Sequence, residues 1–95
     1  MKITTIKVDY YVIPLEGNLV DALHGKHDNF ELVVANVMLD NGQQGVGYTY
    51  TGGFGGAAIA KMIQQDLAPQ LVGLDMKSPS ELNDYMNKHI HYVAR

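Results

Sequence analysis

Two stretches of the sequence gather the side chains that could bind or transform a small molecule. The first, residues 16–29, contains His24 and His27 three residues apart, with Asp21 and Asp28 nearby. Imidazole and carboxylate groups are common metal ligands, so this grouping could hold a metal ion if the chain folded around it. Spacing alone is weak evidence for a metal, because such residues in a polar loop are more often simply solvated. We therefore predict no metal site in this chain.

The second stretch joins aromatic side chains to a run of glycines between Tyr48 and Gly56. Tyr48, Tyr50 and Phe54 lie where a predicted strand leads into a glycine-rich loop, and they form the most site-like group in the sequence. The glycines have neither the G-x-G-x-x-G spacing nor the lysine of a P-loop, so nucleotide binding is not indicated. They would instead let the loop move, with Phe54 as its bulky contacting side chain. The alternative for Tyr48 and Tyr50 is ordinary core packing, since a period of two places both on one face.

Covalent catalysis finds little support in the sequence. There is no cysteine, and Ser78 and Ser80 are explained by helix capping, with no Gly-x-Ser-x-Gly elbow around either. The carboxylates are scattered along the chain. His89 falls on the apolar stripe of a predicted helix and is expected to be packed or hydrogen-bonded there. We therefore predict no catalytic residue in this chain.

The length and composition limit the class of protein. A chain of 95 residues makes one domain, and 46% apolar against 18% charged residues allows a buried core. The net charge of −3 and the absence of a basic cluster argue against nucleic-acid binding. The sequence has no signal peptide and no apolar run of about 18 residues, so we expect a soluble, cytoplasmic protein without a membrane partner.

Three strands are predicted from the hydrophobic pattern. Residues 2–15 alternate, with Ile6 and Val8 on one face, as in a strand that has one solvated side. Residues 30–39 are apolar on both faces, which is typical of a central strand. Residues 43–51 return as its partner, whereas residues 16–29 are predicted to be a long loop.

A few residues mark the boundaries of these strands. Pro14 cannot donate to a sheet ladder and should lie where the first strand ends. Asn41-Gly42 favours a type I′ hairpin turn. Gly45 and Gly47 indicate a bulge or a close backbone approach.

Two helices are expected after the glycine run. Ile59, Met62, Ile63 and Leu67 recur at helical spacing, and Pro69 should make this helix stop or bend near Ala68. A second helix is predicted from a capping box at residues 78–81. Its buried stripe is expected to contain Leu82, Tyr85, Met86, His89, Ile90 and Val93.

The second predicted helix has a well-formed start, but no capping residue or turn follows it before Arg95. We therefore expect the chain to be the front piece of a longer protein. The predicted fold class is α+β, a three-stranded antiparallel meander followed by a helical segment.

These features together resemble a known family. Lys2-Ile3-Thr4 opens the first strand and Pro14-Leu15 closes it; Asp40-Asn41-Gly42 with Gly45 and Gly47, and the run from Leu67-Ala68-Pro69 to Gly73-Leu74-Asp75, follow further along the chain. Together they resemble the start of proteins of the mandelate racemase/muconate lactonizing enzyme family of the enolase superfamily. The resemblance covers essentially the whole chain. It implies that residues 1–95 are an N-terminal capping and substrate-specificity domain, separated from a catalytic (β/α)₈ barrel that is absent from this chain.

The resemblance also implies a function for the parent enzyme, an acid-sugar dehydratase or racemase, hence a lyase or an isomerase. The barrel would abstract a proton α to a carboxylate with the help of Mg²⁺, and the parent would be a homo-oligomer. Residues 16–29 and 49–56 would be the two cap loops that seal the site. Substrate contacts are then expected from His24, Lys26, Tyr48, Tyr50 and Phe54. The polar His24 and Lys26 suit a hydroxylated acid.

A different class of protein fits the same sequence less well. The chain could be a stand-alone α+β binding or interaction module without catalysis. A capping domain without its barrel should expose an apolar patch and self-associate, whereas a module should be monomeric or form one defined oligomer.

Overall fold

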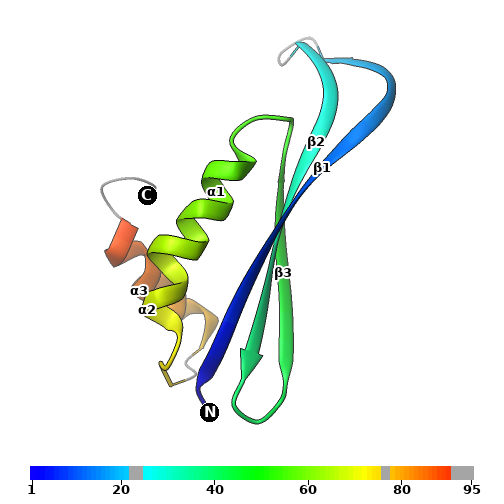
Figure 1. Ribbon diagram of the computed structural model, residues 1–95. Helices are drawn as coiled ribbons and strands as arrows, with labels where there is room; N and C mark the ends of the chain where they lie inside the picture. Colours follow the sequence, from blue (N-terminus) through cyan, green and yellow to red (C-terminus); the bar gives the residue numbers. More distant parts are fainter. Residues whose placement is uncertain (22–24, 76–77, 91–95) are drawn as a thin grey trace.

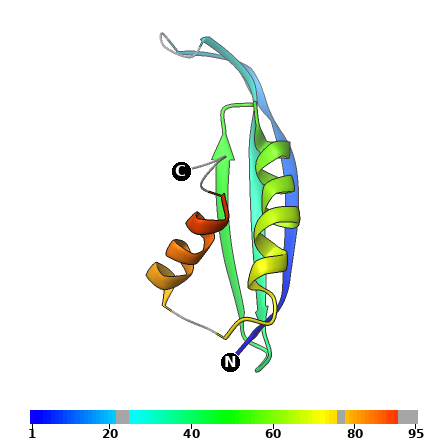
Figure 2. The same cartoon turned by 90° about the vertical axis from the view of Figure 1, so that its left-hand side faces the viewer.

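The computed structural model describes residues 1–21, 25–75 and 78–90, and it describes no side chains for residues 16–28. Three strands form one antiparallel sheet in the order β1-β2-β3. They are β1 (Ile3–Asp21), β2 (Gly25–Leu39) and β3 (Gln44–Thr51). All of the helical segments follow the sheet in the chain and lie against one of its faces (Figures 1 and 2). The predicted α+β meander is therefore confirmed, with β2 as the central strand.

The two faces of the sheet follow from the register. Tyr10 pairs with Val33, which is 1% exposed, and Ile6 pairs with Val37, so these residues share the face that the helices cover. Lys7 and Asp9 lie on the opposite face, as their alternation with Ile6 predicts, and the Lys7 Nζ to Asp9 Oδ1 distance is 4.0 Å. The apolar pattern of the first strand thus identified its buried side correctly.

The prediction of a long loop over Glu16–Asn29 was wrong. Both strands continue through much of it, and Leu19 pairs with His27, Val20 with Lys26 and Asp21 with Gly25. The pairing is irregular between Pro14 and Leu19, so Pro14 ends the regular ladder but not the strand. In Figure 1 this ribbon extends beyond the helices. Because no helix covers it there, the strands need no alternation of apolar and polar residues, and the sequence gives no strand signal.

The connection between β2 and β3 also differs from its prediction. The Gly42 N–H donates to the Leu39 carbonyl over 3.0 Å, and Gly42 has a φ of 88°, whereas no non-glycine residue in the described ranges has a positive φ. A type I′ turn needs a positive φ at Asn41 as well, so this is a type I turn followed by a left-handed glycine. The expected bulge at Gly45 and Gly47 is absent, because β3 pairs with β2 without a register shift.

The first helical segment is longer than predicted. It consists of α1 (Gly56–Met62), the π-helical η1 (Ile63–Leu67) and α2 (Ala68–Leu71), which form one continuous rod in Figure 2. The helix was expected to stop or bend near Ala68, but it passes through Pro69. The π-helical turn widens the helix just before Pro69, where a regular α-helix would use an N–H that proline lacks.

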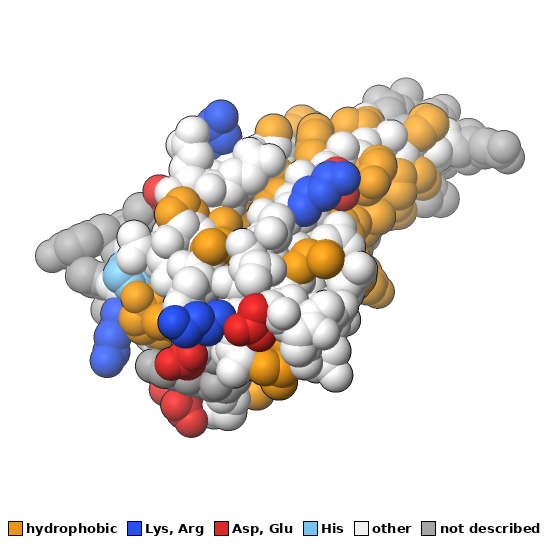
Figure 3. Space-filling model, turned by 60° about the horizontal axis from the view of Figure 1, so that its bottom comes forward, with side chains coloured by type: hydrophobic (Ala, Val, Ile, Leu, Met, Phe, Trp, Pro, Cys, Tyr) orange, Lys and Arg blue, Asp and Glu red, His pale blue; other side chains and the backbone are white. Residues whose placement is uncertain are grey.

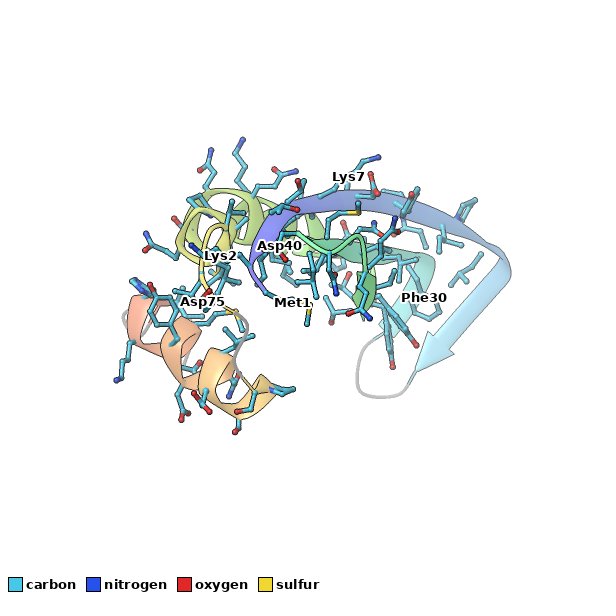
Figure 4. The ribbon with its side chains drawn as sticks, turned by 90° about the horizontal axis from the view of Figure 1, so that it is seen from below. Met1, Lys2, Lys7, Phe30, Asp40 and Asp75 are labelled. Carbon is cyan, nitrogen blue, oxygen red and sulfur yellow. The ribbon has the colours of Figure 1, made fainter. Side chains whose placement is uncertain are left out.

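The segment after α2 closes the end of the domain where the chain begins. The Gly73 N–H donates to the Ile3 carbonyl over 2.7 Å, and the Ile3 N–H donates to the Leu74 carbonyl over 3.2 Å. Lys2 forms an antiparallel bridge with Asp75, and Figure 4 shows both residues beside Met1. Hydrogen bonds with Gly73 and Leu74 therefore hold the first residues of β1 in place.

The last described helix is α3 (Pro79–Ile90). The Glu81 N–H donates to Ser78 Oγ over 3.3 Å, so the predicted N-cap is confirmed. The predicted stripe is half-buried at Leu82, Tyr85, Met86 and Ile90, and Val93 lies outside the described residues. His89 was expected to be packed or hydrogen-bonded in this stripe; its side chain is exposed, and its ring packs edge-on against Tyr85 at a centroid distance of 4.7 Å.

An apolar groove of about 700 Å³ lies between the sheet and the helices. Ile6 and Val37 line it from the sheet, and Leu67, Leu82 and Met86 line it from the helices. No side chain of α3 is fully buried among the described residues. The last helix therefore packs less tightly on the sheet than the rod from α1 to α2, whose Ala60, Ala68 and Leu71 are buried.

Candidate functional site

The glycine loop between β3 and α1, residues 52–55, carries the most exposed large apolar side chain of the candidate group. Phe54 is 90% exposed. Gly53 and Gly55 have φ values of 115° and 87°, a region that favours glycine. A Cβ at Gly53 would also lie 3.1 Å from Asn29 Oδ1 on the neighbouring strand. The loop conformation thus depends on these two glycines, and it displays Phe54 to solvent.

The structure separates the two tyrosines from Phe54. Tyr48 pairs with Val34 and Tyr50 with Leu32, on the sheet face that no helix covers. They are 73% and 69% exposed, so the core-packing alternative is wrong. The Tyr50 ring makes an edge contact with Phe30 at a centroid distance of 6.4 Å. Phe54 belongs to the loop of residues 52–55, whereas the two tyrosines belong to β3.

Of the two polar candidates, Lys26 lies in the extended β1–β2 ribbon. His24 lies outside the described residues, and so does its proposed pairing with His27 in a metal site. The backbone of Lys26 is in β2, paired with Val20. In Figure 1 the outer part of this ribbon and the β3–α1 loop are found at the same end of the molecule, opposite the N-terminus. The fold therefore places Lys26 and Phe54 on segments that share one end.

A buried carboxylate at the base of the glycine loop was missed by the sequence analysis. Glu31 on β2 is 6% exposed, and it is the buried charged residue of the described ranges. Its Oε1 accepts from Thr51 Oγ1 over 2.7 Å and from the Gly56 N–H over 2.8 Å, while Oε2 accepts from the Tyr10 hydroxyl. The signal was an acidic residue at an inward position of a strand that is otherwise apolar on that face.

The same hydrogen bonds shift two titrations in opposite directions. Donation from Tyr10, then from Thr51 and Gly56, lowers the pKa of Glu31 below its ordinary value of 4.5. The hydrogen bond to Glu31, with desolvation and the nearby negative charge, raises the pKa of Tyr10 above 10.0. Both shifts favour an ionised Glu31 that accepts from a neutral Tyr10.

We expect this pair to make the stability of the chain depend on pH. Because folding lowers the pKa of Glu31, its contribution is present above pH 4.5 and is lost as the pH falls through the lower pKa of the folded state. Because folding raises the pKa of Tyr10, its contribution is present below pH 10.0 and is lost as the pH rises through the raised value. Urea midpoints measured across the acid range should fall more steeply for the wild-type chain than for Glu31→Gln. Parallel curves would contradict this.

Other kinds of site find no support in the described part of the chain. Within residues 1–21, 25–75 and 78–90, no three or more His, Cys, Asp or Glu side chains are grouped so that they could hold a metal ion. None of the described helices is long and apolar enough to cross a membrane.

The fold and the displayed loop define a class: a small α+β domain that presents a glycine loop and an extended ribbon at one end and has a helix-covered sheet behind them. The chain belongs to the mandelate racemase / muconate lactonizing enzyme family of the enolase superfamily, whose N-terminal domain it matches over residues 4–95. The resemblance found in the sequence is therefore confirmed.

Individual relatives show how much of a longer protein this domain represents. The chain is 38% identical over 93 residues to a 3,6-anhydro-alpha-L-galactonate cycloisomerase of Streptomyces coelicolor. The matched region covers 98% of this chain and 26% of the relative. A crystal structure of a racemase from Streptomyces coelicolor A3(2) with bound magnesium superposes with a TM-score of 0.92 at 38% identity, with the same coverage of 98% and 26%. The chain thus spans about a quarter of the length of these relatives.

A more distant structure shares the fold. L-Talarate dehydratase from Polaromonas sp. JS666, complexed with Mg and L-glucarate, superposes with a TM-score of 0.86 at 23% identity, covering 99% of this chain and 26% of that chain. These matches leave the barrel outside this chain, as the resemblance implied.

Proposed function

We propose that this chain is the capping and substrate-specificity domain of an enolase-superfamily enzyme that acts on a hydroxylated carboxylate of the acid-sugar class. The observation that carries the proposal is the 38% identity over 93 residues to a cycloisomerase of a sugar acid, in which the matched part is 26% of the enzyme. The partner of this domain would be the (β/α)₈ barrel of the same parent enzyme.

The chemical groups that this chain contains decide which roles we assign to it and which to the barrel. The proposed reaction starts with abstraction of the proton α to the carboxylate, a step that both dehydration and racemisation of such an acid require. In this proposal the base and the Mg²⁺ ion belong to the barrel. The described residues of this chain do not fit a magnesium site, because no group of three or more possible ligands is found among them. No step through the metal is therefore assigned to this chain.

The role of the domain would be to close the site and to contact the distal part of the substrate. The glycine loop with Phe54 and the β1–β2 ribbon with Lys26 are proposed contacts, because the fold carries both segments to one end. His24, which lies outside the described residues, is proposed from the sequence alone. Closure of such segments excludes water, which strengthens electrostatic interactions inside the site. Tyr48 and Tyr50 lie on the uncovered sheet face, so we assign them to a protein–protein contact within the parent, proposed to be a homo-oligomer, rather than to the substrate.

We expect His24 and Lys26 to contribute to substrate affinity. In the parent enzyme, His24→Ala and Lys26→Ala should each raise KM for the acid substrate about tenfold, as the loss of a hydrogen bond to a charged group would. Lys2→Ala is the matched control, because it removes a positive charge next to the N-terminus, which lies at the end of the domain opposite the glycine loop in Figure 1. Steady-state kinetics on a panel of sugar acids makes the comparison. Unchanged KM values for both variants would remove these residues from the site.

A further inference from the structure

The buried Glu31 carboxylate connects the two ends of the glycine loop. Thr51, the last residue of β3, donates its hydroxyl to Oε1, and Gly56, the first residue of α1, donates its N–H to the same oxygen. The loop of residues 52–55 lies between these two donors. Thr51 Oγ1 also accepts from the Gly53 N–H over 3.1 Å, so the network reaches into the loop.

We propose that Glu31 is a positioning residue, which fixes both ends of the glycine loop and thereby sets where Phe54 is held over the substrate. This rests on the proposed function for the part that concerns the substrate. The anchor, meaning the hydrogen bonds by which Glu31 holds Thr51 and Gly56, rests only on contacts within the chain.

The burial of Glu31 supports this role. A carboxylate removed from water is unfavourable unless its oxygens accept hydrogen bonds, and an apolar residue on the buried face of a central strand would avoid that penalty. Here both oxygens are used, and two of the three donors belong to the residues that flank the loop. The carboxylate therefore orders polar groups that no apolar side chain at this position could hold.

The support beneath the loop is buried, whereas Phe54 is not packed. Glu31 is two residues from Val33, which is 1% exposed in the central strand. Phe54 is 90% exposed, so its own contacts do little to fix its position. The position of the Phe54 ring must then be set at the base of the loop, where Glu31 lies.

Tyr10 offers a control that separates positioning from stability. Its hydroxyl donates to the other oxygen, Oε2, and it comes from β1 rather than from the loop. Tyr10→Phe removes a hydrogen bond of the same carboxylate and leaves both loop donors in place. Thr51→Val removes the donor to Glu31 and the acceptor of Gly53 with little change in volume.

Amide hydrogen exchange of Gly53 and Gly56, measured on the 95-residue chain, tests the anchor. Thr51→Val removes the acceptor of the Gly53 amide directly, so the Gly56 amide, which donates to Glu31, is the one that tests the anchor. Its exchange should be about tenfold faster or more relative to amides in the middle of β2, because Glu31 loses its hydrogen bond from Thr51 at the loop base. Thr51→Ser keeps the hydroxyl and should exchange as the wild type does. Tyr10→Phe should leave the ratio of loop to sheet exchange unchanged, whatever its effect on the melting temperature.

Two results would overturn the anchor: an unchanged ratio in Thr51→Val, or an equal increase in Tyr10→Phe. If Thr51→Val does not fold, Glu31→Gln serves in its place, with the same expected rise in the ratio. The functional part is read separately in the parent enzyme, where Thr51→Val should raise KM for a sugar acid and Tyr10→Phe should not. A faster-exchanging loop with unchanged KM would support the anchor and overturn the contact of this loop with substrate.

Discussion

Replacing Gly56 with Ala is expected to lower the free energy of unfolding by about 1–3 kcal/mol, the usual penalty for overpacking a filled site. A Cβ at Gly56 would lie 2.9 Å from Glu31 Cβ, from Glu31 Cδ and from Tyr10 Cε1. Glu31 Cβ is attached directly to the central strand, so it cannot move away easily. The new methyl group would also displace the carboxylate from the Gly56 N–H that it now accepts.

Gly47→Ala is the matched control for this substitution. A Cβ at Gly47 would meet nothing within 4 Å, and Gly47 is in the interior of β3. Alanine should therefore be neutral or stabilise the chain by up to about 1 kcal/mol, because glycine loses more backbone freedom on folding. In urea denaturation, the midpoint should fall for Gly56→Ala and should stay unchanged or rise for Gly47→Ala. Equal destabilisation would contradict the packing described at the loop base.

The 95-residue chain is expected to self-associate through the sheet face that no helix covers. Tyr11, Ile13, Val46, Tyr48 and Tyr50 are large apolar or aromatic residues of this face, exposed by 44–73%. In the view of Figure 3, hydrophobic side chains gather on the elongated, strand-built part of the molecule. Strand β3 is also an edge strand, and Gln44–Thr51 contains none of the charged residues that commonly discourage pairing between edges.

Substitution of the two tyrosines tests this surface. Tyr48→Lys combined with Tyr50→Lys should raise the dissociation constant of the self-associated chain about tenfold or more, as expected when aromatic residues are lost from the centre of an interface. Gln64→Lys combined with Gln70→Lys changes the net charge equally on exposed helical positions and should leave association unchanged. Sedimentation velocity over a range of concentrations makes the measurement. A wild-type chain that is monomeric and melts cooperatively would favour the stand-alone module instead.

The sequence predicts an element well where one side of it is buried. Ile6 and Val8 alternate with Lys7 and Asp9 because helices cover only one face of the sheet, and that alternation identified both the strand and its inner face. The Ser78 cap was found for a similar reason, since the capping box is a local pattern of hydrogen bonds. The family resemblance added the place of this domain in a longer enzyme, and the match over residues 4–95 confirmed the family.

The errors fall where backbone pairing or a distant contact decides the structure. Leu19 and Val20 pair with the opposite strand through main-chain groups, which leaves no periodic pattern in the side chains. Glu31 was missed because its partners Tyr10, Thr51 and Gly56 are more than 19 residues away along the chain. Tyr48 and Tyr50 were grouped with Phe54 because they are neighbours in sequence, although the pleat of β3 directs them to the uncovered sheet face.

The intact mass and the activity of the natural protein that contains this sequence test whether residues 1–95 cap a larger enzyme. The account predicts one polypeptide of roughly 40 kDa, about four times the 10.5 kDa of this chain, because the matched domain is 26% of its relative. It also predicts Mg²⁺-dependent exchange of the proton α to the carboxylate of a sugar acid in deuterated water. A natural protein of 10.5 kDa that is monomeric, melts cooperatively and exchanges no such proton would contradict the proposed capping function.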